Sequence, residues 1–260
     1  MKKICVYVSS FDGYSDLWDT FFYIFDHFWW NCTYPIYLVN NKKSFSHDKV
    51  EVIHTGDEKC WFDRTIRSLE RLDEDYVLFM LEDYFISKPI DETIIDEIVE
   101  LMEEKSFFFV RLSKSEIKKN GFAYQRVPSS SGYPISLQPA IWNRKKLIRF
   151  LYEIKGESPW DFEYYFNNCS FGKEQFVPGV LNDNRDVLGY RNGVLRGKWI
   201  PSTLRYYKKL GIAIDTSNRK VLSLKESIRY TVANLVSITF PKRLKKSIKT
   251  FLSKINFNYI

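Results

Sequence analysis

Short apolar runs alternate with longer amphipathic stretches along the first 112 residues, and this alternation limits the possible folds more than any other feature. The runs predict strands at 4–11, 35–40, 49–54, 76–81 and 107–112, and the stretches between them predict helices at 14–30, 61–72 and 89–105. Strands that alternate with helices favour a mostly parallel sheet with right-handed crossovers. We therefore expect an α/β fold whose central sheet is flanked by helices.

The two longest predicted helices have features that place their ends and their buried sides. Ser15 is available as the N-cap of the helix at 14–30. In the helix at 89–105 the apolar residues at helical spacing are Ile90, Ile94, Ile98 and Leu101.

The chain after residue 112 is less regular. Glycines, prolines and serines over 113–135 predict a long loop or an irregular hairpin. A strand at 136–142, a helix from about Asn143, a second helix after Ser158 and a strand at 174–181 follow. The polar, glycine-bearing segment 182–199 is expected to wrap around the site.

Composition indicates a folded protein of a reducing compartment. Apolar residues make up 45% of the chain and aromatic residues 17%, which is enough for a large core. The four cysteines lack CxxC spacing, so we expect reduced thiols in a cytosol. The apolar run after Met1 is too short for a signal peptide, and we expect no transmembrane helix.

Charge divides the chain into two parts. Residues 205–260 contain 13 lysines and arginines but only Asp215 and Glu226 as acids, a net charge of +11. The remainder contains 26 basic and 30 acidic residues, a net charge of −4. We expect a catalytic domain over 1–204 and a basic amphipathic helical tail over 205–260.

The run "YVLFML" at 76–81 is typical of a central parallel strand, and two carboxylates, Glu82 and Asp83, follow it directly. Ligands of open α/β sheets bind outside the carboxyl ends of the strands, so this pair is expected at the site. Carboxylate oxygens suit Mg²⁺ or Mn²⁺, and such a cation would in turn bind a nucleotide diphosphate. A pair that only caps a turn is the alternative.

The order of these elements, with "SDLW", "TG", a helix that begins at a tryptophan and then "LFMLEDYF", resembles bacterial glycosyltransferases of the GT-A fold. It is similar to the small family-2-like enzymes that build capsule, lipopolysaccharide and other surface glycans. The resemblance covers about residues 1–200 and implies a GT-A-like, Rossmann-like sheet. It also implies that Glu82 and Asp83 bind the metal and the donor diphosphate, although the third position of the acidic pattern is Tyr84.

The segment "SPWDFEYYF" at 158–166 offers two candidates for a catalytic base. Ser158 and Pro159 suit the start of a helix, which places Asp161 and Glu163 in or near its first turn. An inverting transfer needs a carboxylate to take the proton of the acceptor hydroxyl, and the resemblance implies one here; we favour Glu163 slightly. Helix capping by either carboxylate is the alternative. Trp160 and Gln138 are the candidates for acceptor binding.

Further donor-binding candidates lie in loops. The resemblance implies that the loop after the first strand, with Ser9 and Asp12, holds base and ribose, while an ordinary turn is the alternative for Asp12. Asp57 and Arg64 are placed to reach the donor, and Arg64 can offer a bidentate fork to phosphate; a surface ion pair is the alternative. The basic loop with Arg196 and Lys198 resembles the lid that closes over the diphosphate, and a solvated loop is the alternative.

Two amphipathic segments occupy the tail. The segment 221–236 carries a helical apolar face and is expected to pack against the body. Residues 242–255 combine another apolar face with six lysines and arginines, which is typical of a helix on an anionic membrane surface. The body is net acidic, so we expect no nucleic-acid partner. We expect the protein in the cytoplasm, peripheral on the inner face of the membrane.

The leading hypothesis is a glycosyltransferase that moves a sugar from a nucleotide-sugar donor, with UDP favoured, to a glycan or a lipid-linked acceptor. The sequence contains no Walker A, GxGxxG or GxSxG pattern and no histidine–cysteine pairing typical of zinc. The alternatives are a sugar-phosphate nucleotidyltransferase and a non-catalytic glycan-binding protein of the membrane surface.

Overall fold

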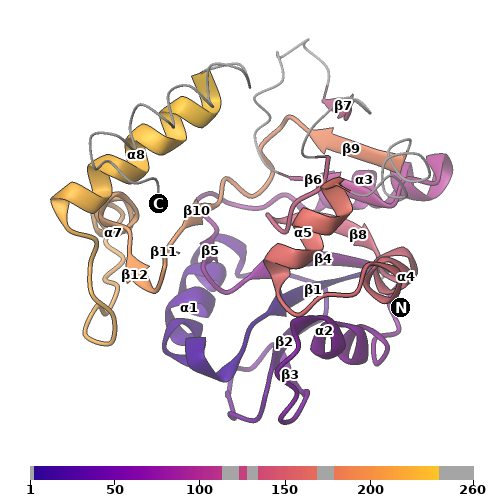
Figure 1. The fold of residues 1–260 in the computed structure, drawn as a ribbon, viewed down its shortest axis with the longest axis horizontal. Helices are drawn as coiled ribbons and strands as arrows, with labels where there is room; N and C mark the ends of the chain where they lie inside the picture. Colours follow the sequence, from indigo (N-terminus) through magenta and orange to yellow (C-terminus); the bar gives the residue numbers. More distant parts are fainter. Residues whose placement is uncertain (1–2, 113–122, 128–133, 169–178, 240–260) are drawn as a thin grey trace. The chain divides into compact units, whose positions relative to one another are not determined.

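The computed structural model describes residues 3–112, 123–127, 134–168 and 179–239 (Figure 1). It divides into two compact units, Met1–Arg191 and Asn192–Ile260, and each unit is described by itself below. The division after Arg191 falls earlier in the chain than the domain boundary expected after residue 204.

The first unit contains an eight-stranded sheet with the strand order β3-β2-β1-β4-β8-β6-β9-β7. The strands in this order are β3 (Val50–His54), β2 (Ile36–Asn40), β1 (Ile4–Ser9), β4 (Tyr76–Leu81), β8 (Ala140–Asn143), β6 (Phe109–Arg111), β9 (Val180–Asp183) and β7 (Tyr124–Arg126). The strands β3, β2, β1 and β4 are parallel to one another, whereas β8 and β7 run against their neighbours. The mostly parallel sheet expected from the sequence is therefore confirmed. The short strand β5 (Tyr84–Phe85) belongs to a separate small sheet, and β10 (Arg191–Asn192) lies at the division between the units.

Helices cover the sheet of the first unit (Figure 1). They are the 3-10 helix η1 (Asp12–Leu17), α1 (Trp18–Trp29), α2 (Trp61–Leu69), α3 (Glu92–Lys105), α4 (Arg144–Ile154) and α5 (Pro159–Asn168). Every residue of β1 is buried, which requires cover on both faces of the sheet because successive side chains of a strand point to opposite faces.

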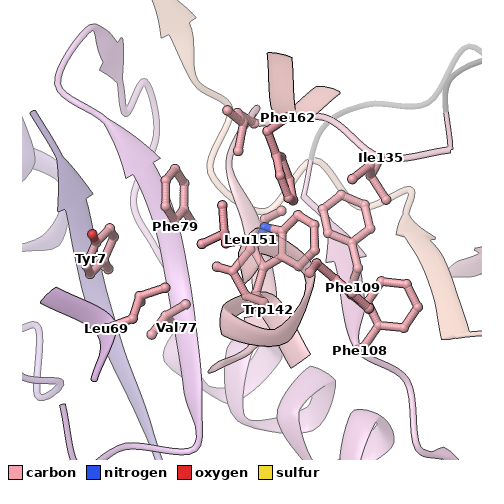
Figure 2. Packing of buried hydrophobic residues seen from close by; sticks show 14 of the residues in the cluster. Tyr7, Leu69, Val77, Phe79, Phe108, Phe109, Ile135, Trp142, Leu151 and Phe162 are labelled. Atoms are coloured by element: carbon pink, nitrogen blue, oxygen red, sulfur yellow. The ribbon is translucent and has the colours of Figure 1, made fainter. Parts of the chain in front are cut away.

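A cluster of aromatic and aliphatic side chains joins α2, α4 and α5 to one face of the sheet. Trp142 of β8 lies at its centre, with ring-centroid distances of 4.5 Å to Phe109 and 5.9 Å to Phe162 (Figure 2). Leu151 of α4 and Phe79 of β4 belong to the same cluster. This packing fixes α5 over the sheet and thereby positions the carboxylates that α5 carries.

Two details of the helices differ from the sequence-based expectation. The segment expected to start at a Ser15 cap is a 3-10 helix over 12–17, and α1 begins after Leu17 without a side-chain cap. In α3 the buried residues are Ile95, Ile98, Val99 and Met102, so the buried face is rotated from the one expected. The cap of α3 is Asp91, whose side chain accepts a hydrogen bond from the backbone N–H of Thr93.

The second unit contains a small hairpin and two helices. The strands β11 (Val194–Leu195) and β12 (Lys198–Trp199) pair antiparallel, and α7 (Pro201–Lys209) and α8 (Leu224–Thr239) follow. The segment 242–255, expected at a membrane surface, lies outside the described residues. Among the described residues, no helix has both the length and the apolar character needed to span a membrane.

Candidate functional site

The carboxyl ends of β1, β2 and β4 meet at one edge of the sheet. Ser9 is paired in register with Val39 on one side and with Leu81 on the other. β8 runs the opposite way and pairs Ala140 with Phe79, so the residues before Ala140 lie at the same edge. This edge is the candidate site, because ligands of open α/β sheets bind outside the carboxyl ends of the strands.

Glu82 and Asp83 stand at this edge directly after β4. Glu82 is buried, with 6% of its surface exposed, and Asp83 is half-buried. The next residue, Tyr84, contacts the ring of Tyr190 at a centroid distance of 5.1 Å. The structure therefore places both carboxylates where the sequence predicted, at the end of a strand that is buried on both faces.

Glu82 and Asp83 are the candidate ligands for a divalent cation at this edge. No group of three or more histidine, cysteine or acidic residues that could hold a metal occurs in the described part of the chain. Carboxylates are ligands of the kind that Mg²⁺ and Mn²⁺ prefer, and these ions usually keep water and substrate phosphates in other positions. Glu82 and Asp83 thus have the ligand chemistry that such an ion prefers, and a bound ion would take further ligands from substrate and water.

Arg64 of α2 brings a positive charge to the same edge. Its Nη1 donates to Oδ1 of Asn41 at 3.2 Å, and its guanidinium carbon lies 5.9 Å from the centre of the Phe11 ring. Burial lowers the pKa of Arg64, while the charges of Tyr7, Glu82 and Asp12 act in the opposite direction. The Nε of Arg64 is buried and has no hydrogen-bond partner among the described residues. Sequence analysis predicted a surface ion pair as the alternative, but the structure shows a half-buried cation.

Ser9, the last residue of β1, and Ser10, which follows it, accept hydrogen bonds from two tryptophans. The indole N–H of Trp61 donates to Oγ of Ser9 at 3.3 Å, and that of Trp18 donates to Oγ of Ser10 at 2.8 Å. Both serines are buried. These contacts hold the end of β1 between α1 and α2, and a hydroxyl that accepts in this way keeps its own proton for donation.

Asp12 is a structural anchor for the loop after β2. Its carboxylate accepts hydrogen bonds from the backbone N–H groups of Asn41, Lys42 and Lys43 at 3.1–3.2 Å. Burial opposes ionisation of Asp12, but these hydrogen bonds outweigh it and lower its pKa. The other loop candidate, Asp57, is exposed and forms an ion pair with Lys42 at 2.5 Å.

The two candidate bases on α5 make different contacts. Oδ2 of Asp161 accepts from the backbone N–H groups of Glu157 and Ser158 and from the Ser158 hydroxyl, at 2.9–3.1 Å. These bonds lower the pKa of Asp161 and cap the helix. Glu163 is buried, with 9% of its surface exposed, and its Oε1 accepts from the backbone N–H of Leu137 at 2.5 Å.

The contact between Glu163 and Leu137 brings this carboxylate to the candidate site. Leu137 lies just before β8, at the same edge as the carboxyl end of β4. Gln138, a predicted acceptor ligand, is the next residue and is half-buried. Trp160 is 77% exposed on α5.

Two residues near Arg64 were missed by sequence analysis, namely Phe11 and Asn41. A signal for Asn41 existed, because the polar pair Asn40-Asn41 follows an apolar strand just as Glu82-Asp83 does. Phe11 carried no signal, because a lone aromatic residue in a loop is not distinguishable from a core residue.

The candidate lid residues Arg196 and Lys198 belong to the second unit. Arg196 occupies the turn between β11 and β12 with a φ angle of 51°. Nζ of Lys198 forms an ion pair with Oε1 of Glu226 at 2.5 Å. Within its own unit, Lys198 is thus bound to an acidic partner.

No family model matches the chain, and no curated protein matches it. Among solved structures, TarS from S. aureus (residues 1–349, in complex with UDP-GlcNAc) is 13% identical, with 96% of this chain and 72% of that chain covered and a TM-score of 0.48. The galactosyltransferase LgtC with donor and acceptor sugar analogues is 10% identical, with 94% and 99% covered and a TM-score of 0.39. A cytidylyltransferase from Leptospira borgpetersenii is 11% identical, with 67% and 72% covered and a TM-score of 0.39. These TM-scores lie below 0.5, so these likenesses assign no activity to this chain.

Proposed function

We propose that this chain is a glycosyltransferase that transfers a sugar from a nucleotide-sugar donor to a glycan or lipid-linked acceptor in the synthesis of a cell-surface polysaccharide. One observation supports this most: a buried acid after β4 (Glu82), a half-buried cation (Arg64) and a second buried acid (Glu163) belong to one edge of the sheet. Transfer of a glycosyl group away from a diphosphate needs a site for the anionic leaving group and a base for the acceptor.

The donor, a UDP-sugar in this proposal, occupies the edge formed by the ends of β1, β2 and β4. Arg64 is close enough to Glu82 and Asp12 for their charges to act on it, and its guanidinium would bind the donor phosphates. Ser9 and Asp12 shape this part of the site, and Asp12 does so by fixing the Asn41–Lys43 loop. Asp57, exposed and paired with Lys42, is the weakest of the donor-binding proposals.

Glu82 and Asp83 would hold Mg²⁺ or Mn²⁺, and the ion would supply positive charge to the diphosphate when bound. Glu163 takes the proton of the acceptor hydroxyl while the acceptor oxygen bonds to the anomeric carbon. The bond from that carbon to the diphosphate breaks at the same time. This single displacement inverts the anomeric centre. Asp161 is the weaker candidate because helix capping already engages its carboxylate.

The remaining parts of the proposal concern the acceptor and the location. Trp160 offers an exposed ring on which a sugar can stack, and Gln138 offers an amide at the edge that holds Glu163. Arg196 and Lys198 would form a basic lid. Residues 242–255 would attach the enzyme to the inner face of the cytoplasmic membrane.

The proposal is tested with the double variant Glu82→Ala/Asp83→Ala. We expect sugar transfer, followed by release of the nucleoside diphosphate from a panel of nucleotide sugars, to fall by at least about 100-fold, because preorganised charge at a leaving group contributes on this order. The circular dichroism spectrum should match that of the unaltered protein. Full activity in a folded double variant would rule the proposal out.

Product assays on the unaltered protein distinguish the two alternatives from a glycosyltransferase. A sugar-phosphate nucleotidyltransferase would release pyrophosphate from a nucleoside triphosphate and a sugar phosphate, without hydrolysis or transfer of a nucleotide sugar. A glycan-binding protein without catalysis would produce neither product.

A further inference from the structure

Polar contacts within the second unit fix the first turn of α8. Ser223 and Glu226 form a reciprocal capping box: the backbone N–H of Ser223 donates to Oε2 of Glu226 at 2.8 Å, and the backbone N–H of Glu226 donates to Oγ of Ser223 at 3.3 Å. Oε1 of the same Glu226 accepts from Nζ of Lys198 on β12. These contacts determine which side of α8 faces the hairpin of its own unit (Figure 1).

The residues just before α8 are also fixed to this hairpin. The backbone N–H of Trp199 donates to the carbonyl of Lys220, and the N–H of Leu222 donates to the carbonyl of Trp199, both at 2.9 Å. Leu222 is buried as a result, with 6% of its surface exposed. The neighbouring residue Val221 bridges to Trp199 through its backbone, yet its side chain is 42% exposed.

Three exposed apolar residues form what we call the α8 stripe: Val221, which precedes the helix, and Leu224 and Ile228, which lie on the helix itself. Leu224 is 79% exposed and Ile228 is 49% exposed, and their spacing of four residues places them one above the other on the helix. The expectation that 221–236 packs against the body concerns a contact between the two units, and it stays a prediction. Scattered exposed leucines are ordinary, but an apolar row along one helix face is typical of an interaction surface.

The charge of the second unit specifies what kind of surface would cover the stripe. Residues 192–260 contain fifteen lysines and arginines and only two acids, a net charge of +13, and nine of those basic residues lie within the described 192–239. Two lysines next to the stripe in sequence are exposed. Lys220 precedes Val221, and Lys225 follows Leu224. A suitable partner must therefore accept apolar side chains and present negative charge beside them.

We propose that α8 lies on an anionic lipid bilayer, with Leu224 and Ile228 among the acyl chains and Lys220 and Lys225 at the level of the lipid phosphates. An interfacial amphipathic helix has this combination of an exposed apolar row and flanking lysines. The inference extends the attachment proposed for 242–255 to a described element. It does not depend on sugar transfer.

The test measures co-sedimentation of the full chain with two kinds of vesicle, one of phosphatidylcholine alone and one that also contains phosphatidylglycerol. We expect binding to the anionic vesicles that weakens as salt is raised. The variant Leu224→Ser/Ile228→Ser should reduce this binding about tenfold or more, because two buried aliphatic side chains are lost from the bilayer. The matched control Tyr23→Ser/Tyr152→Ser removes exposed apolar surface from the first unit and should bind as the unaltered protein does.

Three results would overturn the inference. The first is unchanged vesicle binding by the Leu224/Ile228 variant, which would assign attachment to another segment. The second is equal binding to both kinds of vesicle, or binding to neither. The third is a dimer in solution that the Leu224/Ile228 variant dissociates, which would assign the stripe to a second copy of the chain. Transfer to a water-soluble acceptor, measured on the same variants, reports separately on the proposed enzymatic function.

Discussion

Asp161 and Glu163 stand two residues apart on α5, and their contacts assign them different tasks. Asp161 closes a capping box with Ser158 at the start of the helix, where its carboxylate has three hydrogen-bond donors. Glu163 is buried and directed to the backbone N–H of Leu137, at the edge where β4 ends. A sequence pattern alone cannot distinguish the two, because both acids satisfy the preference for negative charge near a helix N-terminus.

The variant Glu163→Gln is therefore expected to separate catalysis from structure. Glutamine keeps an oxygen that can accept from Leu137, so the fold should persist, but it cannot take up a proton at neutral pH. We expect kcat to fall by about 10²–10⁴-fold, the range that general base catalysis supplies, with little change in the KM for the donor. Steady-state kinetics with a nucleotide sugar and an acceptor would measure both constants.

Asp161→Ala is the matched control. It removes the capping carboxylate and should lower the thermal midpoint by about 2–4 °C, as expected for loss of a helix cap in a chain of this length. Below that midpoint its kcat should stay near that of the unaltered protein. If instead Asp161→Ala lost activity and Glu163→Gln retained it, the roles assigned to the two acids would be reversed.

At the scale of elements, the strands that build the site were predictable and their surroundings were less so. The run 76–81 matches β4 residue for residue. A continuous apolar run of this length is typical of a strand that is buried on both faces. The buried face of α3 was misplaced because isoleucines occur on more than one side of it, and only tertiary packing selects Ile95 and Ile98 over Ile94.

Long-range contacts account for what the sequence could not show about the site. Glu163 and Leu137 are 26 residues apart, and their contact depends on β8 running against β4. No local pattern indicates that a strand inserts antiparallel into an otherwise parallel region. By contrast, Glu82 and Asp83 could be placed at this edge from the sequence because they directly follow their strand.

The capping box of α8 gives a pH dependence that can be measured. The hydrogen bond from Lys198, with those from Ser223, lowers the pKa of Glu226 from 4.5 to about 2. Because the pKa is lower in the folded state, this pair stabilises the second unit fully above about pH 4.5 and loses that effect as the pH falls toward about 2. Glu226→Gln should thus be less stable than the unaltered protein at neutral pH, and the difference should shrink as the solution is acidified.

Hydrogen exchange of the α8 amides, followed from neutral pH to about pH 3 in both proteins, would measure this difference locally. Lys3→Gln serves as the control, because it breaks an ion pair with Glu103 on the surface of the first unit and leaves the Glu226 capping box unchanged. A difference between Glu226→Gln and the unaltered protein that stayed constant over this pH range would show that ionisation of Glu226 does not hold the helix.

At the scale of the whole molecule, ligand binding and folding are linked. A ligand that binds only the folded state stabilises it by about 2.7 kcal/mol when present at 100 times its dissociation constant. For a chain of this size, a change of 1 kcal/mol moves the thermal midpoint by about 2–4 °C. The edge that gathers Glu82, Arg64 and Glu163 belongs to the first unit, where the eight-stranded sheet provides most of the core, so occupancy of this site should stabilise that unit as a whole.

We therefore expect saturating UDP with Mn²⁺ to raise the thermal midpoint by about 5–10 °C, the shift that these two relations give together. Arg64→Gln should lose most of the shift, because the guanidinium fork that can bind a phosphate is replaced by a neutral amide of similar size. Arg67→Gln is the matched control: Arg67 lies on the same helix, but its partner is Glu58, at 3.6 Å on the surface. Differential scanning fluorimetry of the three proteins would measure the shifts. A shift that survives in Arg64→Gln but disappears in Arg67→Gln would place the diphosphate outside the edge described above, and no shift in any of them would remove the argument for a UDP-sugar donor.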